Sequence, residues 1–482
     1  MHGSKKISPW GLSLIFLAHL SIMGPVFGVD EKGGVRPEAL EARVQKIIAK
    51  SKALGIRDYP IGFWNYATLA KTPVTFNEAE IASWTDAGFT VVQSPEFNAA
   101  APKQVQEMGS ILDLAEKYGI KVLLRDSRAW AFPVGESVEE VSAYKEKLNA
   151  ILRDFGTKPA FLGLCLGDEP EAKAKDALFS ASRTFKQIAP QKVAFSNYLP
   201  WWKPTENEDC VKVVGSTSWP GFLDEIATKA TPDFYSYDMY HQMKPGKGGW
   251  DNYFENLTLW REGALRNGIP FWNTLLCAGH FLYRVPNIDE LRWQFMTTVA
   301  AGAHGVLWFH YYEKDFEINY RQLPVNWIGE RTQTYKDLRL IQRQFQKTYG
   351  DLFTRIVCLK HSFIGEKYGF TNVSLFTGNI FVDSITTDPE NHPLMVSEFV
   401  DALNRPYIMV VNNSMTESTW MTITFKAGVV QLTSFRDGAE TDFAVGAVRR
   451  LSDSPLAIQH VLAPGQEVIW RITPPRNDDP KE

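Results

Sequence analysis

The sequence has few cysteines and no excess of charge of either sign. Its 482 residues include 4 Cys, and none of them lies in a Cys-x-x-Cys pair or a Cys/His cluster with metal-site spacing. We therefore expect buried free thiols, no bound metal and no cofactor, although spacing alone leaves a single disulfide open. The formal net charge is -4, so the chain has no broad basic surface for nucleic acid or an anionic membrane.

Long apolar runs are also scarce, and the N-terminus carries the one that stands out. It covers residues 10–27, follows two lysines and precedes a charged segment. This order is typical of a secretory signal peptide, so we predict cleavage near the end of residues 1–28 and a secreted or periplasmic mature protein. An uncleaved membrane anchor is the alternative, but the run is barely long enough to span a bilayer and contains His19 and Pro25.

A glycine-rich phosphate-binding loop is absent as well, since neither a GxGxxG nor a Walker motif occurs. Short apolar segments instead alternate with helical patterns, which is typical of α/β proteins with parallel strands. Eight such units over roughly 290 residues fit a (β/α)8 TIM barrel, and we predict one over residues 59–356. A doubly wound open sheet is the alternative, but it rarely reaches eight units without a phosphate-binding loop. The predicted strands are residues 60–64, 89–93, 121–126, 161–167, 193–197, 234–238, 271–276 and 305–311.

The pattern changes beyond residue 356 to short strands separated by turn residues, with almost no helix. This predicts a smaller C-terminal β-sandwich over residues 357–475, followed by a polar tail at 476–482. Residues 29–58 form a predicted N-terminal extension. Because the C-terminal strands carry no cluster of carboxylates or histidines, we expect this region to support the barrel without taking part in catalysis.

Polar and aromatic residues gather where the predicted barrel strands end, and in such barrels this end carries the active site. Carboxylates beside flat rings suit a polar, uncharged ligand with apolar faces, which indicates an oligosaccharide or polysaccharide. The histidines among them lack a third ligand at fixed spacing, so they do not predict a metal site. The candidate substrate-binding residues are Trp64, Asp126, Asn197, Tyr240, His280, Trp308 and His310.

The most specific motif is Gly-Asp-Glu-Pro at residues 167–170. Alternation along the fourth strand predicts that the leucines of residues 162–166 face the helices and that Gly167 faces the barrel axis, with Glu169 following its parity. Burial beside other carboxylates would raise the pKa of Glu169, as a general acid requires. The alternative is that Asp168 and Glu169 cap the following helix.

Asp238 is the second predicted carboxylate of the site. It ends the sixth strand and shares its parity with Ser236, so Glu169 and Asp238 can flank one bond. A separation of about 5–5.5 Å would make Asp238 a nucleophile, whereas about 6.5–9.5 Å would leave room for an attacking water. The alternative is a structural acid that bonds the next loop.

These motifs resemble those of the glycoside hydrolase (β/α)8-barrel superfamily. The residues 167–170 are similar to the Asn-Glu-Pro motif of clan A retaining glycosidases, with Asp168 in place of the asparagine. That resemblance implies Glu169 as acid/base and a glutamate nucleophile ending strand seven, where residues 271–280 contain no carboxylate. Adjacent Asp-Glu also resembles substrate-assisted hexosaminidases, which implies that Asp168 positions an acetamido group. The Tyr-Asp that ends at Asp238 resembles the chitinase-like families.

The sequence therefore predicts a secreted glycoside hydrolase that cleaves an oligo- or polysaccharide. Glu169 is the predicted general acid/base, and Asp168 and Asp238 assist it. The alternative is a non-catalytic carbohydrate-binding barrel that has lost its strand-seven nucleophile.

Overall fold

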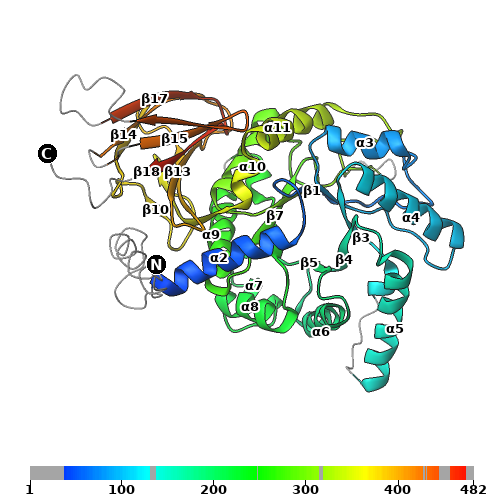
Figure 1. Cartoon of the computed structure of the whole chain (residues 1–482). Coiled ribbons are helices and arrows are strands. Elements are labelled where there is room, and N and C mark those ends of the chain that lie inside the picture. The colour runs from blue at the N-terminus through cyan, green and yellow to red at the C-terminus, as the bar shows by residue number, and fades with distance from the viewer. Residues whose placement is uncertain are drawn as a thin grey trace, which may run out of the picture.

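The computed structural model describes residues 37–130, 137–246, 248–313, 319–426, 429, 431–444 and 456–473. It shows an α/β region with parallel strands beside a β-rich region (Figure 1). The predicted signal peptide and the predicted tail lie outside the described residues. In the ranges that the structure describes, no helix has the length and apolar character needed to cross a membrane.

The α/β region contains two parallel sheets, with strand orders β1-β8-β7-β6 and β2-β3-β4-β5. Hydrogen bonds also connect the two sheets, because the Thr90 amide donates to the Ile61 carbonyl (2.9 Å) and the Tyr198 amide donates to the Ser236 carbonyl (2.8 Å). The strands are β1 (Ile61–Phe63), β2 (Val91–Gln93), β3 (Lys121–Leu124), β4 (Phe161–Asp168), β5 (Val193–Asn197), β6 (Tyr235–Asp238), β7 (Phe271–Leu276) and β8 (Val306–Phe309).

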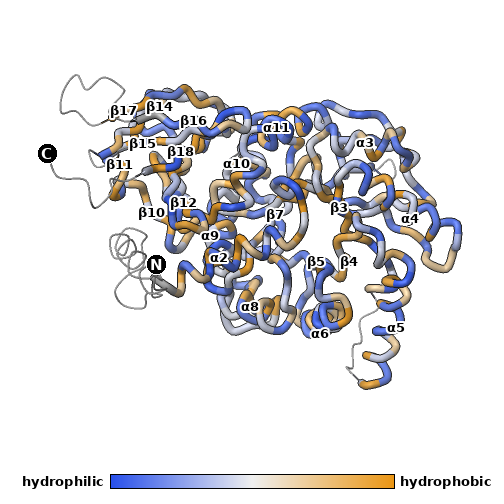
Figure 2. Tube along the Cα trace, in the orientation of Figure 1, coloured by the Kyte–Doolittle hydropathy of each residue, from blue (hydrophilic) through white to orange (hydrophobic). Residues whose placement is uncertain are grey.

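A helix follows each of these strands, as the alternation predicts. Side-chain caps explain several starts: Asn77 caps α3, and Ser137 and Asn287 each form a capping box with the glutamate three residues later. Apolar and polar residues alternate along the outer helices α5 and α6 (Figure 2). The helices are α3 (Glu78–Asp86), α4 (Pro102–Lys117), α5 (Val138–Phe155), α6 (Ala172–Ile188), α7 (Cys210–Val213), α8 (Trp219–Glu225), α9 (Trp250–Asn267), α10 (Ile288–Ala300) and α11 (Gln333–Tyr349).

Two apolar clusters lie on the two faces of the parallel strands. The larger one joins the strands to the surrounding helices. The smaller one draws residues from the strands or from positions directly beside them, and it lies on the opposite face: Trp64, Val91, Leu123, Leu162, Cys165, Val193, Phe195, Phe234, Trp272 and Leu307. The parallel strands are therefore buried on both faces, which explains their nearly continuous apolar sequences.

Strand β4 departs from simple alternation. Its pairing with β3 and with β5 shifts register, the latter between Cys165 and Gly167. As a result Leu162 lies with Cys165 in the smaller cluster, so the prediction that it faces the helices is wrong. A Cβ on Gly167 would lie 2.8 Å from the Leu178 side chain of α6, so Gly167 faces the helices and not the axis. A bulge places an extra residue in one strand and thereby inverts the parity beyond it.

The β-rich region consists of two sheets, a seven-stranded one in the order β10-β9-β12-β13-β18-β15-β16 and a three-stranded one in the order β11-β14-β17. Side chains from both sheets share one apolar cluster. The other face of the seven-stranded sheet packs against the helices of the α/β region. The strands are β9 (Ile356–Ile364), β10 (Ser374–Leu375), β11 (Val382–Asp388), β12 (Leu394–Asp401), β13 (Pro406–Asn412), β14 (Thr419–Phe425), β15 (Gln431–Arg436), β16 (Ala439–Ala444), β17 (Leu456–Leu462) and β18 (Glu467–Thr473).

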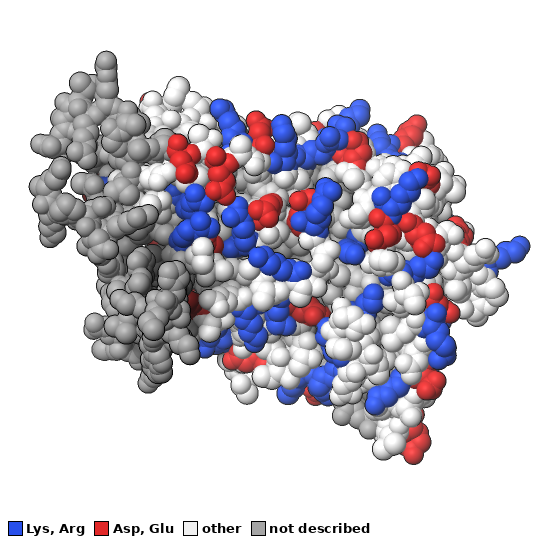
Figure 3. All heavy atoms as spheres, viewed as in Figure 1, with Lys and Arg blue, Asp and Glu red and all other residues white. Residues whose placement is uncertain are grey.

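One helix lies in the predicted N-terminal extension. Helix α2 (Pro37–Ala53) packs Val44 and Ile47 against Val357 and Val400 of the β-rich region, and its Lys46 ammonium donates to the Asn267 carbonyl at the end of α9 (3.1 Å). It therefore connects the two regions. On the face in Figure 3 basic and acidic side chains are interspersed.

Candidate functional site

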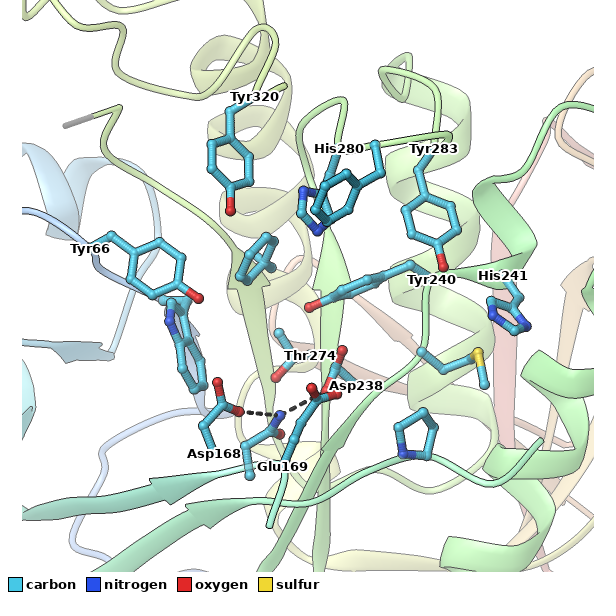
Figure 4. A pocket seen from close by; sticks show the side chains of 16 residues that line it. Tyr66, Asp168, Glu169, Asp238, Tyr240, His241, Thr274, His280, Tyr283 and Tyr320 are labelled. Atoms are coloured by element: carbon cyan, nitrogen blue, oxygen red, sulfur yellow. Dashed lines mark hydrogen bonds between the residues drawn. The ribbon is translucent and has the colours of Figure 1, made fainter. Parts of the chain in front are cut away.

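A pocket of about 430 Å³ lies where the parallel strands end. Side chains at or just beyond the carboxyl ends of β1, β4, β5, β6, β7 and β8 line it, together with residues from the loops that follow β7 and β8 (Figure 4). The lining residues are Trp64, Tyr66, Asp168, Glu169, Asn197, Pro200, Asp238, Met239, Tyr240, His241, Thr274, His280, Phe281, Tyr283, Phe309 and Tyr320. None of these residues belongs to the β-rich region.

Three carboxyl groups meet on one side of this pocket. The side chains of Glu169 and Asp238 approach closely enough to share a hydrogen bond when one of them is protonated. The Asn197 amide nitrogen donates to Asp168 Oδ1 (3.1 Å) and to Asp238 Oδ1 (2.7 Å), as Figure 4 shows. The Asn197 oxygen in turn accepts from the Ser236 hydroxyl (3.1 Å), which fixes the orientation of the amide. Asn197 therefore holds two aspartates from different strands in one arrangement.

The backbone brings Glu169 into the pocket in an unexpected way. Since the register shift in β4 inverts the parity, Asp168 ends the strand facing the pocket. Glu169 then adopts a φ of 44°, in the left-handed region, and its amide donates to the Asn197 carbonyl (2.9 Å). A turn thus directs two consecutive carboxyl groups into the same pocket, which a continuous strand would send to opposite faces.

All three carboxyl groups have raised pKa values. Asp168 and Glu169 are accessible from the pocket, but protein surrounds them on the other sides, and lost hydration is the largest cause of the raised pKa. The negative charge of Asp168 raises the pKa of Glu169 further. The pKa of Asp238 is raised most strongly, first by burial and then by the charges of Glu169 and Asp168. The hydrogen bonds from Asn197 oppose these effects at both aspartates.

Aromatic rings form the opposite walls. Trp64 and Tyr66 make an edge contact with ring centroids 6.2 Å apart, and Tyr240 and Tyr283 make another at 5.9 Å. Figure 4 shows Tyr66 on one side of the carboxyl groups and Tyr240 with Tyr283 on the other. Burial raises the pKa of Tyr283 to about 12, so its hydroxyl stays protonated at neutral pH.

Two histidines line the pocket, and both are neutral at pH 7. His280 stacks on Tyr320 with centroids 5.0 Å apart, and burial lowers its pKa. Burial also lowers the pKa of His241 to about 4. Arg125 lies behind the pocket wall, over the rings of Trp64 and Tyr66, and its charge lowers the pKa of Asp168. No lysine or arginine is among the described residues that line the pocket.

Three of the predicted binding residues do not line the pocket. Asp126 is buried in an ion pair with Arg128 (2.6 Å). Trp308 faces the helices and packs near Phe295 of α10, because β8 alternates from Leu307 and turns Trp308 outward. His310 packs behind the wall against Tyr66 and Tyr320, with centroids 5.1 and 4.6 Å away, and burial lowers its pKa to about 3. Asp126, Trp308 and His310 were predicted to bind substrate, but their side chains do not line the pocket.

The other predicted residues meet in the pocket: Trp64, Asp168, Glu169, Asn197, Asp238, Tyr240 and His280. Sequence reasoning missed its loop-borne half, which includes Tyr66, His241, Phe281, Tyr283 and Tyr320. It also missed Thr274, which ends up beside Asp238 because the two residues are partners in the β6–β7 ladder. The sequence does contain aromatic residues in the segments that follow β7 and β8. It does not give the conformation of those loops, so it could not place these residues in the pocket.

The structure also shows the state of the four cysteines and the arrangement of possible metal ligands. All four cysteines are free and buried, as predicted. Among the residues that the structure describes, His, Cys, Asp and Glu do not gather in groups that could hold a metal ion.

Comparisons with known proteins give structural neighbours only, because no protein-family model and no curated protein matches the sequence. One neighbour is a β-galactosidase from the psychrophilic Marinomonas ef1, with a TM-score of 0.42 and 12% identity. The match covers 59% of this chain and 59% of that chain. A glucosidase from Croceicoccus marinus has a TM-score of 0.42 and 10% identity, with 87% of this chain and 96% of that chain covered. An endo-1,4-β-D-mannanase from Thermotoga petrophila has a TM-score of 0.41 and 13% identity, with 60% and 99% covered.

These neighbours are named as glycosidases, and the similarity to each of them is weak.

Proposed function

We propose that this protein is a glycoside hydrolase in which Glu169 is the general acid/base and Asp238 its proton-sharing partner. The observation that carries the proposal is the close approach of these two carboxyl groups in a pocket with aromatic walls. Such a pair needs one proton to form a hydrogen bond, and burial together with the neighbouring carboxylate charges raises its pKa values, which favours retention of that proton. Glycosidic bond cleavage requires one protonated and one ionised carboxyl group, and a singly protonated pair supplies both.

The reaction would begin when a sugar enters between the aromatic walls and parts the two carboxyl groups. Glu169 then gives its proton to the glycosidic oxygen, so that the bond to the leaving group breaks as positive charge develops on the sugar. Ionised Asp238 and Asp168 stabilise that charge. A water then completes the cleavage, and its proton returns to Glu169.

Two routes to the intermediate fit these residues. Asp238 can attack the anomeric carbon, or Asp168 can position an acetamido group of the substrate that attacks instead. Because Glu169 and Asp238 are close enough to share a hydrogen bond, a sugar that enters between them would part the two groups and set the separation at which they work. Asn197 serves both routes because it holds both aspartates.

We further infer that the two parallel sheets are halves of one (β/α)8 barrel and that the β-rich region is a β-sandwich. The inter-sheet hydrogen bonds at Ile61 and Ser236, and one apolar cluster fed from around the whole ring of strands, support the barrel. The apolar cluster shared by the two antiparallel sheets supports the sandwich. Secretion after removal of residues 1–28 remains part of the proposal.

The test compares three amide variants on one substrate. Aryl and natural glycosides of galactose, glucose, mannose, fucose and N-acetylglucosamine are screened with the wild type, and the best substrate is then used with Glu169→Gln, Asp238→Asn and Asp168→Asn. Glu169→Gln should lower kcat by about 10²–10⁴-fold on a natural glycoside and less on an aryl glycoside, whose leaving group needs little protonation. An unchanged rate on the natural glycoside would exclude Glu169 as the acid.

Azide separates the two routes. If Asp238 is the nucleophile, Asp238→Ala should form a glycosyl azide and regain part of its turnover, whereas Asp168→Ala should not. If the acetamido group attacks, only N-acetylated sugars are cleaved and Asp168→Asn costs as much as Glu169→Gln.

A non-catalytic carbohydrate-binding protein is the second candidate, and one observation favours it. Thr274 is the β7 side chain that lines the pocket, so no carboxylate from that strand reaches the site. Binding of a polysaccharide without release of sugar would support this candidate.

A further inference from the structure

The turn that follows β7 presents two large apolar side chains at the mouth of the pocket. Phe281 is 69% exposed and Leu282 is 58% exposed, so the turn places two adjacent apolar side chains in contact with solvent. Phe281 lines the pocket and Leu282 does not. The two residues therefore differ in what they can contact, although they are neighbours in one turn.

The backbone holds this turn firmly. The amides of His280 and Tyr283 donate to each other's carbonyls (3.3 and 2.8 Å), so Phe281 and Leu282 form its tip. Gly279 pairs with Arg321 through two backbone hydrogen bonds (2.9 and 3.0 Å), and the Arg321 guanidinium also donates to the Tyr283 carbonyl (2.8 Å). The tip is thus fastened to the segment that carries Tyr320.

Phe281 has an unfavourable backbone conformation. Its φ is 45°, in the left-handed region where a bulky residue is a rare outlier and glycine or asparagine is favoured. The side chain of Asn319 accepts from the Phe281 amide (2.6 Å) and stabilises this conformation. A bulky ring in a position that suits glycine costs free energy, and such residues cluster at functional sites.

The ring occupies a place outside the carboxyl groups. Its centroid lies 4.3 Å from that of His280, and His280 stacks on Tyr320. Asp238 is half-buried at the inner end of the pocket, whereas Phe281 is mostly exposed at its mouth. A sugar unit bound beside Asp238 would therefore not reach Phe281, and the next sugar unit of the oligosaccharide would contact it instead.

We propose that Phe281 is a specificity-determining residue that stacks on the second sugar of an oligosaccharide bound in the pocket. The proposal rests on the function inferred above. It implies that the protein prefers substrates of two or more sugar units over glycosides of a single sugar. An exposed ring with an apolar face suits this role because sugar rings present a flat C–H face.

The experiment compares Phe281→Gly with wild type on the 4-nitrophenyl glycosides of one sugar and of its disaccharide. Phe281→Gly should lower kcat/KM on the disaccharide glycoside by about tenfold and leave the monosaccharide glycoside within about twofold. Leu282→Gly is the matched control and should change neither, and Phe281→Trp should retain the preference. The thermal midpoint of Phe281→Gly should not fall, because glycine suits the φ at this position.

Three results would overturn the assignment. Equal losses on both glycosides would assign Phe281 to the reacting sugar, and no loss on either would remove it from binding. A change of association state in Phe281→Gly, measured by size-exclusion chromatography, would assign the ring to a protein contact instead.

Measurements of sugar binding distinguish a failure of the Phe281 proposal from a failure of the hydrolase proposal. If the wild type cleaves neither glycoside, that proposal fails, and calorimetric titration with the same two compounds still decides the role of Phe281. A disaccharide Kd about tenfold weaker in Phe281→Gly, with an unchanged monosaccharide Kd, supports it. Two equal Kd values, or no disaccharide binding by the wild type, overturn it.

Discussion

Glu169→Gln is expected to stabilise the folded protein at pH 7 while it removes the proton donor. In the wild type, Glu169, Asp168 and Asp238 have raised pKa values, so the folded state binds more protons than the unfolded state above the ordinary carboxyl pKa, 4.5 for a glutamate. Stability conferred by these groups is therefore present at low pH and is lost as the pH rises. An amide at position 169 carries no charge at any pH and can donate to ionised Asp238.

The magnitude follows from the contact between the carboxyl groups. Retaining a proton in the pair at pH 7 costs at most the repulsion that it avoids, which for two unit charges about 4 Å apart is about 4 kcal/mol at an effective dielectric constant near 20. Glu169 is accessible from the pocket, and solvent screening reduces the effect to about 1 kcal/mol. In a chain of this length that corresponds to a rise of about 1–2 °C in Tm.

The assay is thermal unfolding at pH 4 and pH 7 of the wild type, Glu169→Gln and the control Glu107→Gln. Glu107 is exposed on α4 and does not line the pocket. It is also distant in the sequence from Asp168 and Asp238. The gain should occur for Glu169→Gln at pH 7 and largely vanish at pH 4, where Glu169 is protonated in the folded state and mostly protonated in the unfolded state. An equal gain at both pH values, or a loss of Tm at pH 7, would refute the electrostatic account of this pocket.

Three further outcomes are expected. Asn197→Ala should lower kcat by about 10–100-fold and move the acid limb of kcat/KM to higher pH, because both pocket aspartates lose the hydrogen bond that lowers their pKa. Gly163→Ala should lower the free energy of unfolding by about 3 kcal/mol in denaturant unfolding, since its Cβ would lie 2.0 Å from the Val193 carbonyl oxygen. Gly109→Ala, at an open position of α4, is the control and should raise the free energy of unfolding by about 0.5–1 kcal/mol. The four buried cysteines should stay unmodified by iodoacetamide until the protein unfolds; rapid labelling of the native protein would contradict their burial.

The sequence predicts the α/β region well because each strand is buried on both faces and each helix has one apolar face. Strand β12 is harder to recognise, because Ser397 and Glu398 interrupt its apolar run although both side chains are buried. Helix α2 was missed because it lies before the first strand and outside the repeating pattern.

The rule that active sites follow strand ends locates the pocket residues that strands carry, but parity along a strand is less reliable. Two register shifts of β4, one against β3 near Leu162 and one against β5 between Cys165 and Gly167, reverse the expected faces of Leu162 and Gly167, and a bulge leaves no mark in a sequence of small and apolar residues. Loop residues such as Tyr66, Tyr283 and Tyr320 could not be predicted because turn geometry, not periodicity, brings them to the pocket.

Two carboxyl groups of the pocket lie where the two parallel sheets meet. Asp168 ends β4 in one sheet and Asp238 ends β6 in the other, and Asn197 of β5 donates to both. The same junction carries the Ser236 hydroxyl and the hydrogen bond from the Tyr198 amide to the Ser236 carbonyl. The contacts that join the two sheets therefore also fix the distance between the aspartates. The turn of Phe281 takes no part in these contacts, so under the proposed function the carboxyl groups and the recognition of a second sugar depend on separate parts of the fold.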